Sequence, residues 1–134
     1  MHFESINWLA AIVCLVLNII IGSVWYGPKT FFPVWWKSIG KTENDKPNGK
    51  PLTWILLVVA GIVQIIFVAL TVQLLGIKNA ASGALAGFLL WIGFVASTGL
   101  VTKLFPGQLK AWVIEEGHHL INFLVFGIIF GAWH

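Results

Sequence analysis

The sequence predicts an all-α integral membrane protein, a bundle of four transmembrane helices in a single domain that covers residues 1–134. Hydrophobic residues make up 58% of the chain and charged residues only 10%, which lies well outside the composition of soluble proteins. The apolar residues gather in four long runs, and almost every charged residue lies between the runs.

Each run is long enough to cross a bilayer as a helix. The runs are residues 6–26, 52–75, 80–101 and 112–133. At about 1.5 Å per residue, a helix of about 20 residues spans a hydrocarbon core of about 30 Å. Backbone groups in lipid have no water to bond, so a spanning segment must be a helix or part of a closed barrel. The continuous apolarity of these runs is unlike the alternating pattern of barrel strands.

Small and weakly polar residues indicate which helix faces pack together, because helices in lipid associate through close contacts and hydrogen bonds between them. On a helical wheel these residues form one stripe per run. The stripes are Asn7, Ala11, Cys14, Asn18, Gly22 and Trp25 in the first run, Gly61, Gln64, Val68 and Thr71 in the second, and Ser82, Gly83, Ala86, Gly93 and Ser97 in the third. We expect these stripes to face the bundle interior or to line a cavity, with Asn18 and Gln64 as its polar contacts.

The longest connection, residues 27–51, consists of two parts. Its first part is aromatic and suits a short segment in the headgroup layer, whereas residues 41–51 are polar and predict a mobile turn. Tryptophan and tyrosine concentrate where a membrane meets water. The residues predicted to lie at the membrane interface are Trp25, Tyr26, Trp35, Trp36, Trp112 and Trp133.

The lysines predict the orientation in the membrane. Seven of them lie in the first and third loops, namely Lys29, Lys37, Lys41, Lys46, Lys50, Lys103 and Lys110, and Lys78 lies on the other side. The positive-inside rule then places these loops in the cytoplasm and both termini outside. Because the basic residues are concentrated in these loops, they indicate contact with membrane lipid rather than with nucleic acid.

The fourth run differs because it contains ionisable residues. Glu115, His118, His119 and Asn122 fall within about 100° of one another on a helical wheel, and Glu116 lies to the side. Ionisable groups at depth in a membrane usually face protein or a water-filled cavity. Together with Asn18, these four residues predict a ligand-binding pocket in the cytoplasmic leaflet. Alternatively, a helix that begins near His118 would leave both glutamates solvated in its first turn.

The spacings Glu115-x-x-His118 and Glu116-x-x-His119 also occur in di-metal carboxylate bundles. Such sites need further carboxylates, which a symmetric dimer would have to supply, so the metal question stays open and no cofactor is expected. An enzyme that uses Glu–His acid–base chemistry has no nucleophile or cofactor motif to support it.

The segment Gly22-Ser-Val-Trp25-Tyr26-Gly27-Pro28, followed by Trp35-Trp36-Lys37, resembles a known signature. It is similar to that of the bacterial membrane family catalogued as domain of unknown function 1761. The resemblance covers essentially the whole chain, including a final apolar helix that ends near Trp133. It implies a small four-helix membrane architecture in the inner membrane of a bacterial cell, and it implies no activity and no catalytic residues.

Two functions fit these observations. The first is a small-molecule or ion binding or transport protein whose pocket contains the polar cluster, with protonation of the two histidines changing the binding. The second is a non-catalytic membrane scaffold or accessory subunit that binds anionic lipid or a partner protein through the lysine-rich loop and Trp35–Trp36. In either case we expect a homo-oligomer, because a bundle this small with glycine stripes has further faces that can pack.

Overall fold

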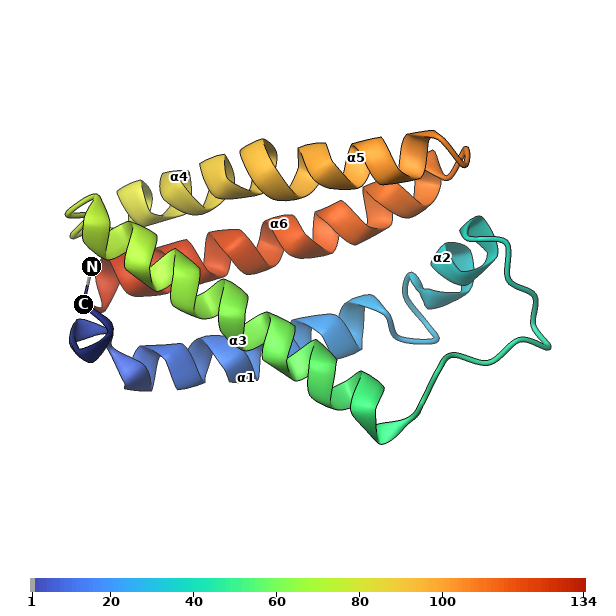
Figure 1. Cartoon of the computed structure of the whole chain (residues 1–134), viewed down its shortest axis with the longest axis horizontal. Helices are drawn as coiled ribbons and strands as arrows, with labels where there is room; N and C mark the ends of the chain where they lie inside the picture. The colour runs from blue at the N-terminus through green and yellow to red at the C-terminus, as the bar shows by residue number, and fades with distance from the viewer. Residues whose placement is uncertain (1) are drawn as a thin grey trace.

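The computed structural model describes residues 2–134, and four long helical spans dominate it (Figure 1). The first is α1 (Trp8–Trp25), which follows the short turn η1 (Phe3–Ser5), and the second is α3 (Pro51–Leu74). The third consists of α4 (Ala80–Leu90), η2 (Trp91–Ala96) and α5 (Ser97–Leu104), and the fourth is α6 (Leu109–Ala132). A short helix, α2 (Phe32–Ser38), lies between α1 and α3.

The structure confirms the predicted all-α class with four membrane-spanning helices. Each span is long and apolar enough to cross a bilayer, and no β-strand occurs between residues 2 and 134. The observed spans begin and end within three residues of the predicted bounds.

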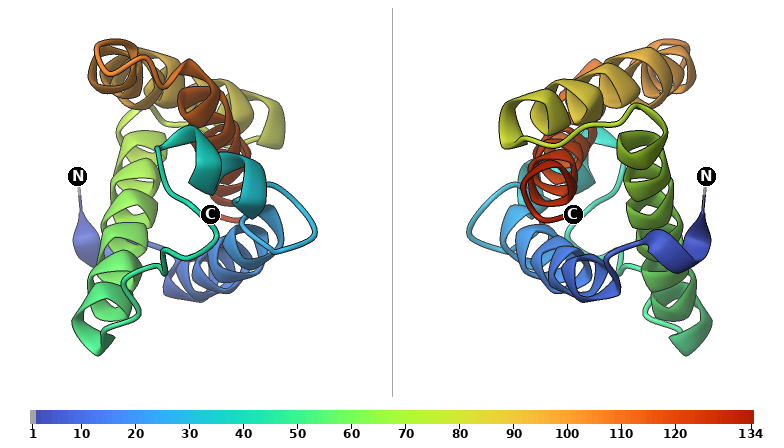
Figure 2. Two further views of the ribbon diagram at one scale, coloured as in Figure 1. Left: turned by 90° about the vertical axis from the view of Figure 1, so that its right-hand side faces the viewer. Right: turned by 90° about the vertical axis from the view of Figure 1, so that its left-hand side faces the viewer.

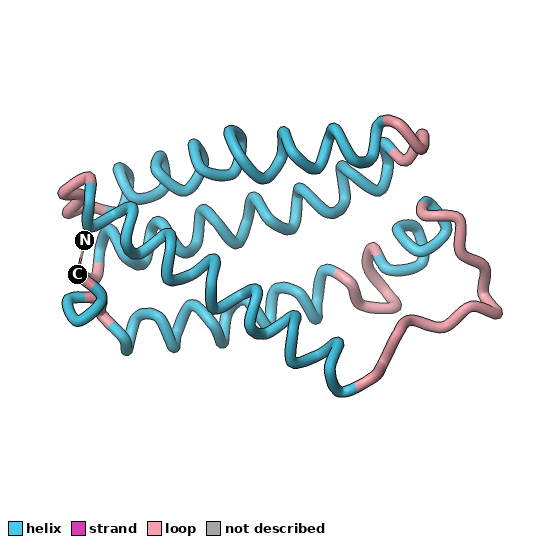
Figure 3. Tube along the Cα trace, viewed as in Figure 1, coloured by secondary structure: helices cyan, strands magenta, loops and turns pink. Residues whose placement is uncertain are grey.

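Both ends of the chain lie at one end of the bundle, which we call the terminal end (Figure 3). The loop between α1 and α3 and the loop after α5 lie at the other end, which we call the lysine-rich end.

Local sequence signals fix several helix ends. The Asn7 and Asn79 side chains cap α1 and α4 by accepting hydrogen bonds from the backbone N–H groups of Ala10 and Ser82. Pro51 opens α3, where a missing N–H costs nothing.

α4 and α6 pack at backbone contact, because glycines lie where the two helices meet. A Cβ atom on Gly83 would collide with the carbonyl of Gly127, and one on Gly87 would collide with the carbonyl of Phe123. Gly131 is equally close to the start of α4, where a Cβ atom would lie 3.1 Å from the Cα of Gly83. This contact extends along α6 and holds the third and fourth spans together as a pair (Figure 2).

α3 packs against this pair mainly at the terminal end, whereas α1 also contacts α6 near its last residue, Trp25. The buried residues of α1 are Ala10, Ala11 and Cys14, and those of α3 begin only at Gly61. Towards the lysine-rich end the two helices diverge, and residues 51–60 of α3 contain no buried side chain. The bundle is therefore closed at the terminal end, whereas α2 and the ends of α1 and α6 fill the space at the lysine-rich end (Figure 2).

The third span departs from a straight helix at η2, a π-helical segment. Backbone hydrogen bonds in a π-helix reach from residue i to i+5, so the turn is wider than an α-helical turn. The prediction that Gly93 and Ser97 lie on the packing stripe is wrong, because both are exposed. Ala96 is buried instead, and Gly99 lies against α6.

Candidate functional site

The polar residues of the fourth span lie well inside α6. This helix begins at Leu109, so Glu115 and Glu116 lie about two turns into it rather than in its first turn. The alternative in which the helix begins near His118 is therefore wrong. The glutamates are consequently held at fixed positions against neighbouring helices.

One carboxylate oxygen of Glu115 contacts two partners from other elements. Its Oε2 accepts a hydrogen bond of 3.0 Å from the indole Nε1 of Trp35 in α2, and it lies 3.1 Å from the Nζ of Lys103 in α5. Charge-assisted bonds of this kind are about twice as strong as neutral ones. Glu115 thus joins α2 and α5 to α6, which gives it a structural role whether or not it also contacts a ligand.

His118 faces the end of α1. Its ring centroid lies 5.2 Å from that of Tyr26, in an edge-on arrangement, and its Nε2 lies 3.2 Å from the Nδ2 of Asn122. Gly22 makes room for the imidazole, since a Cβ atom there would lie 3.5 Å from Nε2. Residues from the Gly22–Tyr26 segment that carries the family resemblance therefore pack directly on the polar cluster.

Glu116 is the residue that the sequence analysis left outside the predicted site, and it is the more deeply buried of the two glutamates. Only 6% of its surface is exposed. Its Oε1 lies against Gly99 of α5, where a Cβ atom would overlap it. Its Oε2 is buried and has no hydrogen-bond partner among residues 2–134. The burial of this position depends on the π-helical segment, which a helical wheel does not represent.

Three side chains on α6 each contain a buried polar atom without a partner in the described chain: Glu116 Oε2, His119 Nδ1 and Asn122 Oδ1. They follow one another at intervals of three residues, and such residues are neighbours on a helix surface. We call them the α6 row. Leaving one such atom unsatisfied costs about 1–3 kcal/mol. Three in succession indicate a place where water, an ion or a ligand makes the missing bonds.

Tryptophans enclose this region with their indole N–H groups. Trp25 donates to the backbone carbonyl of Ile114 and Trp91 to that of Glu116, each at 2.9 Å. Trp112 donates to the carbonyl of Ala96, also at 2.9 Å. Of the predicted interface residues, Trp25, Trp35 and Trp112 therefore direct their N–H groups into the protein.

Trp36 and Trp133, two further predicted interface residues, lie nearer to the surface. The Trp36 indole donates to the carbonyl of Thr42 at 3.1 Å, and the Nζ of Lys41 lies 5.8 Å from the centre of its ring. Trp133 is exposed just after the end of α6. Membrane contact by these residues remains a prediction.

Asn18 lies against α3 at the level of Gly61, where a Cβ atom would lie 2.7 Å from the Asn18 Nδ2. It is one turn from Gly22, which lies against His118, so the two positions share a face of α1. No hydrogen bond within residues 2–134 joins Asn18 to the side chains of α6. The four predicted residues Glu115, His118, His119 and Asn122 thus lie on α6, whereas Asn18 lies against α3, one turn from the position of α1 that contacts His118.

Tyr26 follows the first span and contributes the phenol that lies against His118. Burial raises the pKa of this phenol well above its ordinary value of 10.0, and the charges of Glu115 and Glu116 raise the pKa further. The phenol therefore remains protonated beside the cluster throughout the physiological pH range.

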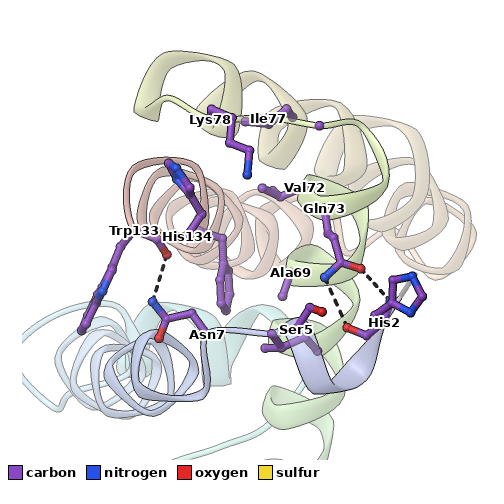
Figure 4. A pocket seen from close by; sticks show the side chains of 13 residues that line it. His2, Ser5, Asn7, Ala69, Val72, Gln73, Ile77, Lys78, Trp133 and His134 are labelled. Atoms are coloured by element: carbon purple, nitrogen blue, oxygen red, sulfur yellow. Dashed lines mark hydrogen bonds between the residues drawn. The ribbon is translucent and has the colours of Figure 1, made fainter.

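A separate hollow of about 290 Å³ lies at the terminal end (Figure 4). Its floor is apolar and includes Val72 and Phe130. Its polar groups largely satisfy one another: Gln73 makes two hydrogen bonds with the backbone of His2, and the Asn7 side chain donates to the carbonyl of Trp133. This pattern fits a closed helix end better than a ligand site, and it contrasts with the unsatisfied atoms of the α6 row.

Few side chains in the described part of the chain could act together as metal ligands. Within residues 2–134, no three His, Cys, Asp or Glu side chains lie close enough together to hold one metal ion. Cys14, the single cysteine, is buried in α1 and belongs to the hydrophobic core. Within a single chain, the polar cluster of α6 therefore consists of hydrogen-bonding groups and does not form a metal centre.

Four apolar spans around an inward-facing polar cluster define a multi-pass integral membrane protein. The chain belongs to the family described as "Protein of unknown function (DUF1761)", whose model matches residues 9–131. This match confirms the resemblance seen in the sequence and covers nearly the whole chain. No curated protein and no solved structure matches the chain.

Proposed function

We propose that the protein binds a small polar molecule or ion at the α6 row, in the half of the bundle nearer to the lysine-rich end. One observation carries this proposal: three buried polar atoms, on side chains spaced three residues apart along α6, have no partner in residues 2–134. Buried polar groups in proteins are nearly always bonded, and buried water or a ligand makes the bonds that the chain does not.

The chemistry of the α6 row favours a ligand that donates hydrogen bonds. An amide oxygen accepts only, an ionised carboxylate accepts only, and a neutral imidazole nitrogen can accept. Small cations with N–H donors, such as ammonium or methylammonium, match this set, and the Glu116 carboxylate supplies an opposite charge. Protonation of His119 at Nδ1 would turn an acceptor into a donor and would weaken the binding of such a cation.

The divergence of α1 and α3 favours access from the lysine-rich end, because the terminal end is closed by packed side chains and hydrogen bonds. Transport across the membrane would require a second opening at the terminal end. We therefore place binding first, and treat transport as a further step that needs a change in the packing of α1 and α3.

The two glutamates offer a matched test. Glu116→Gln and Glu115→Gln remove the same charge at adjacent positions, but only Glu116 belongs to the α6 row. We would titrate the detergent-solubilised protein with ammonium and methylammonium and follow its melting temperature. Wild type and Glu115→Gln should be stabilised by the cation, whereas Glu116→Gln and His119→Ala should lose that response. Equal responses in all four proteins would contradict the proposal.

The second candidate function is a scaffold or accessory subunit, favoured by the concentration of lysines at one end of the bundle. Native mass spectrometry of the gently extracted protein separates the two. A retained small mass that Glu116→Gln lacks supports the binding function, whereas a bare protein or a retained protein partner supports the scaffold. The same spectrum reports whether the chain is the homo-oligomer that we propose.

We also propose that the lysine-rich end lies in the cytoplasm of a bacterial cell and that both termini lie outside its inner membrane. Labelling of single cysteines in a Cys14→Ser background tests this orientation. A membrane-impermeant maleimide should label Lys78→Cys in intact spheroplasts and should label Lys46→Cys only after the membrane is opened. The opposite pattern would reverse the orientation.

A further inference from the structure

We propose that Lys37 and Lys110 form a binding site for the phosphate headgroup of an anionic phospholipid. The two lysines lie around a hollow of about 500 Å³ between α2 and the start of α6. Pro33, Val34 and Ser38 complete its lining. This site is separate from the α6 row, and its existence does not depend on that row.

Both ammonium groups are available to an outside anion. The ion pairs found within the described chain are His2–Glu4 and Lys103–Glu115, so neither Lys37 nor Lys110 is paired with a carboxylate there. Both lysines are exposed. The nearby acid Glu115 is already bound by Lys103 and Trp35, which leaves the positive charge at the hollow largely uncompensated.

The start of α6 adds to the positive electrostatic potential at the hollow. Its first turn contains no acidic residue, and Gln108 at the N-cap position makes no side-chain capping bond. The first N–H groups of a helix carry a partial positive charge and attract anions. Lys110 lies within this turn, so its ammonium and the helix end act on the same ligand.

The position along the membrane normal matches a headgroup. α6 begins at Leu109, and its 24 residues are longer than the roughly 20 needed to cross the hydrocarbon core, so Lys110 in its first turn is expected at the boundary between the apolar core and the headgroup layer. α2 lies beside this end of α6 (Figure 2), held there by the hydrogen bond from Trp35 to Glu115. A phosphate bound here would sit at the depth where lipid phosphates already lie.

The walls of the hollow distinguish a lipid from a soluble anion. Pro33 and Val34 form an apolar side next to the two cations, and 46% of the Val34 surface is exposed. A lipid can cover this wall with its glycerol and upper acyl carbons while its phosphate meets the lysines. Lysines near the membrane surface are attracted by anionic lipids, whereas the amine of a zwitterionic lipid opposes this attraction.

The test compares two double variants with the same net charge. Lys37→Gln with Lys110→Gln removes the lysines of the hollow, and Lys46→Gln with Lys50→Gln removes two lysines of the loop outside it. The full chain in detergent is titrated with phosphatidylglycerol and with phosphatidylcholine of the same acyl chains. Native mass spectrometry then counts the bound lipids.

We expect one phosphatidylglycerol to bind preferentially to wild type and to the loop variant, and the hollow variant to lose this preference over phosphatidylcholine. Lys37→Arg with Lys110→Arg should retain the binding, which separates loss of charge from misfolding. Equal losses in both glutamine variants, or equal binding of phosphatidylcholine, would overturn the proposal. Displacement of the lipid by millimolar glycerol phosphate would also overturn it, because it would identify the site as one for soluble anions.

Discussion

Replacing Gly83 with alanine should separate the third and fourth spans and destabilise the protein. The new Cβ atom would lie 2.8 Å from the carbonyl carbon of Gly127 and closer still to its oxygen. It would also lie 3.1 Å from the Cα of Gly131. All of these atoms belong to the backbone of α6, so no side-chain rotation can relieve the collision, and the helices must move apart.

The expected magnitude follows from the distance that the helices must move. Carbon atoms pack best at about 3.5–4.0 Å, so α4 and α6 must separate by roughly 1 Å, and such a gap forfeits up to about half of the dispersion energy of each contact. Overpacking of this kind typically costs about 1–3 kcal/mol. Because the contact runs along most of α4, we expect a cost of about 2–3 kcal/mol, which lowers the ratio of folded to unfolded protein by a factor of about 30–150.

Unfolding by sodium dodecyl sulfate in mixed micelles measures this change, with the near-ultraviolet circular dichroism of the eight tryptophans as the probe of tertiary packing. Gly93→Ala is the matched control, because a Cβ atom there has no neighbour within 4 Å in the described part of the chain. The control should stay within about 0.5 kcal/mol of wild type. If Gly83→Ala unfolds at the same detergent fraction as wild type, the backbone contact between α4 and α6 is not as described.

Three further predictions concern the polar half of the bundle. Tyr26 is the only tyrosine and the tryptophans do not titrate, so the change in absorbance at 295 nm with pH reports the ionisation of Tyr26 alone. The folded protein should still hold this proton above pH 10. Because the unfolded chain releases this proton at about pH 10, the free energy of unfolding should fall as the pH rises beyond that value. A titration midpoint near pH 10 for Tyr26 in the folded protein would refute this reasoning. Trp91→Phe should cost about 1 kcal/mol in the micelle assay, because it removes the bond to a backbone carbonyl of α6; the exposed Trp54→Phe should cost almost nothing. Gly61→Ala should destabilise wild type but not an Asn18→Ala background, since its Cβ atom would meet only the Asn18 side chain, and equal costs in both would exclude that contact.

The sequence alone was sufficient to predict the four spans, because lipid imposes one strong requirement on a spanning segment. A long apolar run must form a helix, and its length must match the hydrocarbon thickness. The bounds of α1, α3 and α6 follow from where the apolar residues start and stop. The polar cluster on α6 was also visible, since its members recur at helical spacing in a run that otherwise lacks charge.

The roles of the two glutamates could not be predicted in the same way. A helical wheel places Glu115 with the histidines and Glu116 to the side, and it contains no information about neighbouring helices. Glu115 is satisfied by Trp35 and Lys103, which lie far from it in the sequence and reach it only through the fold. Glu116 is buried because Gly99 faces it, and that contact depends on the backbone of the third span.

The number of residues in the π-helical segment determines whether Gly99 faces Glu116. Gly87 and Gly99 are 12 positions apart, which in a regular helix amounts to about 1200°, so they would point about 120° away from each other. The wider turn takes up one extra residue, which reduces the difference to about 20° and lets both glycines face α6. Deleting a single residue from this turn would rotate Gly99 and Lys103 together by about 100°. Variation in length within residues 91–96 can therefore remodel the surroundings of both glutamates while every side chain of the site keeps its identity.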